Sequence, residues 1–393
     1  MKIHPASPLR LLILSLFLIL ILAACASTTS APAASDNEST AAPAAPPAQS
    51  APATDALPEF CGDASQLAAE LHFFNWADYM DEDIMAQFEE ACGVKVTQDI
   101  YSSNEDLIAK LQAGNSGYDL VIPSDYAVQI LINADLLHPL DMANIPNVAN
   151  IDPNLMGMYY DPENVYSIPY QWGTTGIAYN VTAYPDGVDS WAAIFDPAQV
   201  CEQKGFASML DDERESIGAT LKYLGYSYND TDPDHQAQAR DTLLAQKECL
   251  AGYNSDNYNQ TLASEEVMIA HAWSGGTALA RSENENVKFV IPKEGGTIWM
   301  DNMTIPADAP NIYTAEIFIN YLLSPEIGAQ LSNYTYYFTP NLAAQPLLDP
   351  DYHALLESGG MLVDDAVRAR LEWIKRDESS IIFSDTWTAV KAR

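Results

Sequence analysis

Residues 292–306 read PKEGGTIWMDNMTIP and place a tryptophan and an aspartate two positions apart, at Trp299 and Asp301. Residues two apart lie on the same face of an extended strand, so the ring and the carboxylate would sit side by side. An electron-rich ring face and a carboxylate together suit an organic cation with an apolar body, and they suit phosphate, nucleic acid or a metal ion poorly. For one such pair, a core tryptophan beside a surface aspartate is the simpler interpretation. The combination recurs along the chain, however.

Large aromatic residues and carboxylates also follow other predicted strands. The residues that this pattern singles out are, in chain order, Trp76, Tyr79, Ser124, Asp125, Tyr126, Asp211, Asp212, Glu213, Glu215, Trp273, Trp299, Asp301, Tyr336 and Tyr337. Asp212 and Glu215 are three apart, so a helical turn would put both on one face. Asp212 could instead only favour a helix N-terminus, and Trp76 and Trp273 could be core residues. The recurrence favours binding, because these positions include no lysine or arginine.

A linear polyamine is the ligand class that this set fits. Its ammonium groups need carboxylates, and its methylene groups need flat apolar walls. A carboxylate–ammonium contact near 4 Å contributes about 4 kcal/mol at an effective dielectric constant of about 20, before desolvation is subtracted. An ammonium over an aromatic face adds roughly 0.5–2 kcal/mol. We therefore expect the carboxylates to set charge and spacing, and the rings to set shape.

Strands and helices alternate in the secondary structure that the sequence predicts. Strands are expected at 71–76, 94–100, 119–123, 175–180, 205–210, 287–291 and 298–305, and helices at 83–92, 103–111, 128–137, 216–224, 235–250 and 314–334. Ser102 and Glu105 have the spacing of a capping box at the second of these helices. The alternation predicts an α/β fold with parallel, doubly wound sheets. Such sheets bind ligands beyond the carboxyl ends of their strands, where most candidates fall.

The N-terminal residues have the pattern of an export signal. Two basic residues precede an apolar run over 11–22, which is too short to be a stable bilayer anchor. The Ala-Ala-Cys that follows resembles a bacterial lipobox, which implies a lipoprotein signal peptide at 1–24 and a lipidated Cys25. Residues 25–65 are expected to include a disordered tether rich in Ala, Pro, Ser and Thr. The protein is thus expected to be extracytoplasmic, on the outer face of the cell membrane.

Charge and cysteine content limit the other function classes. The formal net charge of −36 at pH 7 argues against nucleic acid and anionic lipid as partners and is compatible with attracting cations. The four cysteines after Cys25 suggest two disulfides in an exported chain. Three pairings are open, of which we expect Cys61 with Cys92 and Cys201 with Cys249. No CxxC motif or Cys/His cluster occurs, so neither a structural metal nor a cofactor is expected.

Several segments, in order along the chain, resemble the bacterial spermidine/putrescine-binding proteins, the extracytoplasmic receptors of polyamine ABC importers. They are FFNWADYM (73–80), YDLVIPSDY (118–126), YSIPYQWGTTGIAYN (166–180), LDDERES (210–216), YNSDN (253–257), PKEGGTIWMD (292–301) and FTPNLAA (338–344). The resemblance implies a two-lobed periplasmic-binding-protein (venus-flytrap) fold, in which a hinge joins two doubly wound sheets and the polyamine is clamped between the lobes. The implied lobes are 66–174 with 299–345, and 175–298 with 346–393.

The resemblance also implies individual roles for ten of the candidate residues. Trp76 and Tyr79 would contact one amine end of the ligand, and Ser124 and Tyr126 would line the cleft. Asp212 and Glu215 would bind ammonium groups, and Trp273 and Trp299 would stack on the methylenes. Asp301 would be a central carboxylate and Tyr337 a further wall. Three positions depart from the family pattern. Ala77 stands where family members often have a hydroxyl residue. Ile374 is the nearest equivalent in sequence of a glutamine that contacts the ligand in the spermidine receptors. Gly276 stands where putrescine-selective relatives have an aspartate. Gly276 and Asp212 together favour spermidine over putrescine.

Other function classes stay open at this point. Asp212 and Glu215 could form the acid–base pair of a secreted hydrolase, although the sequence has no serine-nucleophile elbow or HExxH motif. The adjacent Tyr336 and Tyr337 are typical of ferric-ion receptors of similar architecture, and another amine ligand or an acidic adhesin on a tether are further alternatives. The interpretation we favour is a monomeric receptor without enzymatic activity. Its expected partners are a polyamine, an ABC permease and, through Cys25, the membrane.

Overall fold

The computed structural model describes residues 57–375 and 380–392, so the expected signal peptide and Cys25 lie outside the described residues. All described residues belong to one compact unit, Asp55–Arg393. Its strands are β1 (Glu70–Trp76), β2 (Lys95–Tyr101), β3 (Leu120–Val121), β4 (Leu137–His138), β5 (Ser167–Asn180), β6 (Ala207–Met209), β7 (Gly252–Tyr253), β8 (Ile269–Trp273), β9 (Val287–Val290), β10 (Gly296–Pro306) and β11 (Leu371–Trp373). None of the helices within 57–375 and 380–392 is long and apolar enough to cross a bilayer.

The helices alternate with these strands along most of the chain. They are α1 (Glu82–Cys92), α2 (Asn104–Gln112), α3 (Asp125–Asn133), α4 (Ala192–Phe195), α5 (Pro197–Val200), α6 (Glu213–Tyr223), α7 (Pro233–Lys247), α8 (Tyr258–Ala263), α9 (Ser274–Glu283), α10 (Ile312–Leu322), α11 (Pro325–Thr335), α12 (Pro350–Gly359), α13 (Asp365–Arg368) and α14 (Ile381–Lys391). The α/β alternation predicted from the sequence is therefore present.

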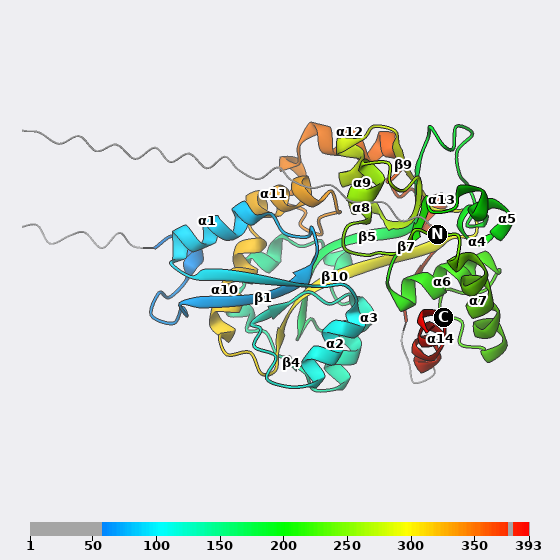
Figure 1. Ribbon diagram of the computed structural model, residues 1–393. Coiled ribbons are helices and arrows are strands. Elements are labelled where there is room, and N and C mark those ends of the chain that lie inside the picture. The colour runs from blue at the N-terminus through cyan, green and yellow to red at the C-terminus, as the bar shows by residue number, and fades with distance from the viewer. Residues whose placement is uncertain (1–56, 376–379, 393) are drawn as a thin grey trace, which may run out of the picture. The chain divides into compact units, whose positions relative to one another are not determined.

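The described strands are linked in one hydrogen-bonded sheet, in the order β2-β1-β3-β10-β5-β8-β6-β7, with β4 and β11 paired to β10 and β9 paired to β5. β1, β2 and β3 are parallel at one end, and β6, β7 and β8 include the parallel pairs at the other. Between them run the two long strands β5 and β10, which pair antiparallel (Figure 1). Two α/β sets are thus present as expected, but β5 and β10 pass through both and join them. The reason is that β5 begins at Ser167, well before the expected strand at 175–180.

Three local features differ from the sequence-based expectation. The expected helix at 314–334 is two helices, because Pro325 lacks a backbone N–H and starts a new helix, α11. The N-cap of α2 is Ser103, whose side chain accepts from Asp106 N, rather than Ser102. Ser102 Oγ instead donates to Asp256 Oδ1 at 2.7 Å. Finally, α3 begins at Asp125, earlier than the expected helix at 128–137.

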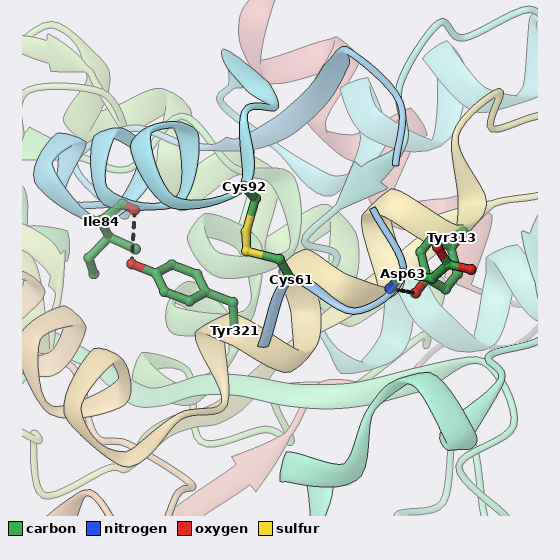
Figure 2. Close-up of a disulfide and its surroundings, with 6 residues drawn as sticks. All are labelled: Cys61, Asp63, Ile84, Cys92, Tyr313 and Tyr321. Atoms are coloured by element: carbon green, nitrogen blue, oxygen red, sulfur yellow. Dashed lines mark hydrogen bonds between the residues drawn. A yellow bond between two sulfur atoms is a disulfide. The ribbon is translucent and has the colours of Figure 1, made fainter. Parts of the chain in front are cut away.

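Two disulfides fasten the described unit, and their pairing is the one expected. Cys61 is bonded to Cys92 and Cys201 to Cys249, with Cα atoms 5.5 and 4.9 Å apart. The first disulfide ties the segment before β1 to the end of α1 (Figure 2). Tyr313, on α10, accepts a hydrogen bond from Asp63 N through its hydroxyl, so this segment packs on a second helix as well. The ordered structure therefore begins before residue 65, within the range expected for the tether.

Candidate ligand-binding site

The ten predicted ligand-binding residues line a single cavity. The empty space among their side chains, including a part that is open to solvent, is about 520 Å³. Four further residues complete the lining: Ala77, Asn104, Asp125 and Ile374. The lining contains several carboxylates and large rings but neither lysine nor arginine. Segments from both ends of the sheet contribute to it.

Asp301 lies at an irregularity in β10, and this irregularity positions its side chain. The pairing of β10 with β5 shifts register between Asp301 and Asn302, and such bulges redirect a side chain locally. The carboxylate of Asp301 accepts hydrogen bonds from Ser124 Oγ at 2.6 Å and Tyr79 Oη at 2.8 Å. Burial raises the pKa of Asp301 to about 7, against the hydrogen bonds from Ser124 and Tyr79, which lower it. Asp301 is therefore ready to change its charge near neutral pH.

Glu215, in the first turn of α6, has more side-chain hydrogen-bond donors around it than Asp301. It accepts hydrogen bonds from Thr175 Oγ1 at 2.8 Å, Tyr228 Oη at 2.6 Å and Trp273 Nε1 at 3.1 Å. Burial raises the pKa of Glu215, and these three donors lower it, as does the nearby Arg214 guanidinium. Side chains from β5, from β8 and from the segment after α6 thus fix one carboxylate in place.

Asp212 has both of the roles that the sequence left open. Its Oδ1 accepts from Arg214 N at 2.9 Å and Glu215 N at 3.0 Å, so it is the N-cap of α6. It also lines the cavity and is 3% exposed. Burial raises the pKa of Asp212 well above its usual range, and the charges of Glu105 and Glu215 raise it further. Capping and ligand binding are compatible here, because a carboxylate has accepting capacity on two oxygens.

Aromatic rings form the walls between these carboxylates. Trp76 and Trp273 meet edge to face with ring centroids 5.8 Å apart, and Trp299 and Tyr337 do so at 5.4 Å. The Trp299 ring lies against Gly173, where a Cβ atom would come within 2.7 Å of it, so only glycine leaves room for the indole. The walls are therefore built by close packing, which fixes their spacing.

Tyr126, the remaining predicted residue, is almost fully buried at the start of α3. Its hydroxyl donates to Glu105 Oε1 at 3.3 Å, and the Arg214 guanidinium carbon lies 5.8 Å from its ring centroid. Tyr126 thus lines the cavity and also contacts this arginine, which is not part of the lining.

Two neighbours of the predicted residues point elsewhere. Asp211 is bound by Lys391 Nζ at 2.8 Å and is absent from the cavity lining. Tyr336 stacks on Tyr352, so Tyr336 and Tyr337 do not face the cavity as a pair. This arrangement disfavours the ferric-ion alternative. In the described ranges, no group of three or more His, Cys, Asp or Glu side chains has the geometry of a metal site.

Two polar residues that line the cavity, Asn104 and Asp125, received no role from the family resemblance, although the sequence pattern singled out Asp125 as a carboxylate after a predicted strand. Asn104 exchanges hydrogen bonds with Ser124, donating from Nδ2 to Ser124 Oγ and accepting from Ser124 N, both at 3.0 Å. It thereby orients the hydroxyl that reaches Asp301. The SDY run after β3 was a signal for Asp125, but its orientation depends on where α3 begins.

The chain matches the model of a known protein family, the bacterial extracellular solute-binding proteins, over residues 83–357. The chain belongs to this family. It is 37% identical over 344 residues to a putrescine/cadaverine-binding protein of Pseudomonas aeruginosa, covering 84% of this chain and 96% of that protein. It is 39% identical over 283 residues to the spermidine/putrescine-binding periplasmic protein of Escherichia coli, covering 72% and 80%. A solved structure of a putative spermidine/putrescine ABC transporter protein from Listeria monocytogenes superposes with a TM-score of 0.77 at 35% identity, covering 82% of this chain and 99% of that one.

Three predictions from the sequence are confirmed by these comparisons. The resemblance to the spermidine/putrescine-binding proteins extends over most of the chain. The fold is the α/β periplasmic-binding-protein fold, because the superposition on the solved structure from Listeria monocytogenes covers 82% of this chain and 99% of that one. The protein is an extracytoplasmic solute-binding protein of the transport type and not an enzyme, as membership of this family implies.

Proposed function

We propose that the protein binds a linear polyamine in this cavity and delivers it to an ABC import permease. The observation that carries the proposal is one cavity in which buried Asp212, Glu215 and Asp301 alternate with tryptophan and tyrosine walls. Buried carboxylates are costly unless a cation compensates them. An ammonium chain supplies that compensation at intervals, and its methylenes match the rings between. The names of the relatives from Pseudomonas and Escherichia, which specify putrescine, cadaverine and spermidine, support this ligand class.

Within this class, spermidine is the ligand we favour over putrescine. The departure at Gly276 has a physical reason in the packing, since a Cβ atom there would lie 1.9 Å from Tyr258 Oη. An aspartate at this position, as in putrescine-selective relatives, has no room unless Tyr258 moves. Ile374, the nearest equivalent of a glutamine of the spermidine receptors, lines the cavity with an apolar side chain and is a departure from those receptors.

Capture requires the two lobes, 66–174 with 299–345 and 175–298 with 346–393, to close on the ligand. The hydrogen bonds that join these segments include Ser102 Oγ to Asp256 Oδ1 at 2.7 Å, Asn259 Nδ2 to Asp78 Oδ2 at 3.0 Å and Gly276 N to Tyr337 Oη at 3.2 Å. A ligand drives closure only by binding the closed state more tightly than the open one. Carboxylates on both lobes, Asp301 on one and Glu215 on the other, supply that difference. The closed receptor then docks on the permease.

We also infer that the receptor is held at the membrane by a lipid on Cys25, which lies outside the described residues. The lipobox-like sequence and the Ala/Pro-rich stretch after it support this inference. In cell fractions, the wild-type chain is expected in the membrane with the mass of a lipid on its N-terminal cysteine. The Cys25→Ala variant is expected in the soluble extracytoplasmic fraction or as an uncleaved precursor. A wild-type protein without attached lipid would contradict the anchor.

Calorimetric titration of the purified protein with spermidine, putrescine and 1,4-butanediol tests the main proposal. The protein is first unfolded and refolded, so that any ligand carried through purification is removed. Tight one-to-one binding of spermidine is expected, with weaker binding of putrescine and none of the diol, which has a similar chain but no charge. Binding of neither amine by a folded protein would overturn the proposal, and stronger binding of putrescine would overturn the preference alone.

A further inference from the structure

Asp125 is a carboxylate of the cavity to which neither the family resemblance nor the proposed function gives a role. It is the first residue of α3, directly after Ser124, and its exposed fraction is 0%. It lines the same cavity as Asp212, Glu215 and Asp301. Its side chain accepts hydrogen bonds from two backbone N–H groups of the described chain, Tyr126 N at 2.6 Å and Met300 N at 3.3 Å. The first of these comes from the next residue in the chain, and the second is long.

Buried aspartates elsewhere in the protein receive more donors. Asp119, also fully buried, accepts from His72 N at 2.8 Å, from Asn311 N at 2.9 Å and from Asn311 Nδ2 at 3.3 Å. Asp161 accepts from three backbone N–H groups and from Ser167 Oγ, all within 3.0 Å. Neither of these residues lines the cavity. They are structural carboxylates whose oxygens are satisfied by the fold, whereas Asp125 keeps accepting capacity at the cavity.

None of the described side chains that line the cavity carries a positive charge that could compensate Asp125. Burial raises the pKa of Asp125 well above its usual range, and the charges of Asp301 and Glu215 raise it further, against the two backbone N–H groups. Tyr159 and Tyr160 are the other titratable groups that interact with it. Burial and the neighbouring carboxylates thus favour the protonated form of Asp125 when no ligand is bound. A cation in the cavity would reverse this balance, since an opposite charge nearby favours the ionised form.

We propose that Asp125 is a fourth ligand-binding carboxylate, and that it makes the cavity prefer amines with three or more ammonium groups to diamines. The proposal rests on the polyamine binding proposed above. A diamine brings two positive charges to four carboxylates, so at least two of the four stay protonated. A triamine such as spermidine brings a third charge, which allows Asp125 to ionise and contribute an ion pair. Asp125 then strengthens the binding of triamines and has little effect on the binding of diamines. Its ionisation when a triamine binds releases a proton.

The test compares wild type, Asp125→Asn and a matched control, Asp119→Asn, by calorimetric titration with spermidine and with putrescine at pH 7. Each titration is repeated in two buffers of different ionisation enthalpy, which gives the number of protons released. In Asp125→Asn, spermidine affinity is expected to fall about 10- to 100-fold while putrescine affinity changes by less than about threefold. Proton release on spermidine binding is expected to be smaller than in wild type. Asp119→Asn is expected to lower the melting temperature and leave the ratio of the two affinities unchanged.

Several outcomes separate the two proposals. An equal loss of both affinities in Asp125→Asn, or an unchanged ratio with unchanged proton release, would overturn the role of Asp125 and leave polyamine binding intact. Binding of neither amine by wild type would overturn both. If Asp125→Asn fails to fold, Asp125→Ser removes the carboxylate with a smaller side chain, and the same shift in the ratio is expected of it.

Discussion

Asp301 and Glu215 are two carboxylates of one cavity with the same exposed fraction, 4%, yet they are held in different ways. Asp301 has two hydroxyl donors, Ser124 and Tyr79, and its pKa is raised to about 7. Glu215 has three side-chain donors and a nearby guanidinium, which work against the effect of burial. Equal burial therefore does not mean an equal environment. The two carboxylates differ in the number of donors and in the neighbouring charge, which oppose the effect of burial on their pKa.

This difference suggests that Asp301 and Glu215 contribute to ligand binding in different ways. Glu215 has three side-chain donors and a nearby guanidinium, which favour its ionised form against the effect of burial before the ligand arrives. Asp301 gains its full charge as the ligand arrives, because a nearby ammonium favours the ionised form. The comparison can be tested by changing one side at a time, beginning with the largest expected effect.

Asp301→Asn is expected to have the largest effect on binding. The variant keeps the size of the side chain but removes the charge that pairs with an ammonium, and losing one partner of a buried pair costs about 2–5 kcal/mol, or roughly 30- to 5,000-fold in affinity. Thermal unfolding without ligand should be nearly unchanged, because Asp301 is partly neutral at pH 7 already. Calorimetry and a melting curve measure the two quantities. Near-native affinity in this variant would mean that the site is wrongly placed.

Glu215→Gln is expected to lower both affinity and stability. The three donors around Glu215 all point hydrogens at it, and an amide NH₂ group cannot accept from them. Thr175 and Trp273 share Oε1, so the amide NH₂ would take the place of Oε2 and the buried hydrogen bond from Tyr228 to Oε2 is lost, which costs about 0.5–1.5 kcal/mol of folding free energy. The melting temperature should therefore fall in Glu215→Gln and not in Asp301→Asn. Equal melting temperatures for the two variants would contradict the comparison.

Trp299→Ala is expected to weaken binding about 10- to 30-fold, because it removes an apolar wall of the cavity and not a charge. Trp299 also donates from Nε1 to Thr175 Oγ1 at 3.1 Å, and Thr175 in turn donates to Glu215. Trp299→Phe is the matched variant, since it keeps a ring but loses this N–H. A loss of only about threefold is expected for it. If both variants lose affinity equally, the hydrogen bond and not the wall is what matters.

The sequence was sufficient to predict the alternation of strands and helices and the residues at the strand ends, because both depend on local patterns. The length of β5 was not predictable in this way. A strand buried on both faces has no apolar–polar alternation to mark its ends, and β5 is buried along almost its whole length. The break at Pro325 was visible in the sequence, and treating 314–334 as one helix overlooked it.

The candidate site was predictable to a similar extent. Residues after strand ends converge in this fold class, and the family resemblance assigned roles to ten of them without coordinates. Asp125 was visible among the carboxylates after strand ends but received no role, and Asn104 has neither a ring nor a charge, so the recurring pattern did not include it. The expected helix began at 128, which left Asp125 in a loop, and the true start at Asp125 places it against the cavity. The donors to Asp301 and Glu215 come from distant segments and become visible only in the folded chain.

The affinity for spermidine is expected to fall as the pH is lowered from about 8 to 6, by up to about tenfold. The reason is that Asp301, with a pKa of about 7, must lose its proton to pair with an ammonium. Stability without ligand responds in the opposite direction. The folded-state pKa of Asp301 is above its unfolded value, so its contribution to stability is fully present below the unfolded pKa and is lost as the pH rises through about 7. Titrations across this range should show a clearly flatter profile in Asp301→Asn, and an equally steep one would assign the dependence to another group.

The smallest effects are expected from removing one hydrogen-bond donor from Asp301 or one from Glu215. These variants test the difference between the two carboxylates most directly. Tyr79→Phe leaves Asp301 with Ser124 alone, whereas Tyr228→Phe leaves Glu215 with Thr175 and Trp273. Losing one of two donors should raise the pKa of Asp301 further and move the midpoint of the affinity profile to higher pH. Losing one of three donors, with the Arg214 charge still present, should leave the midpoint almost where it is. At pH 7, Tyr79→Phe should thus weaken spermidine binding by about threefold and Tyr228→Phe by less. A larger shift of the midpoint in Tyr228→Phe would show that Glu215, and not Asp301, is the carboxylate that changes its charge when the ligand binds.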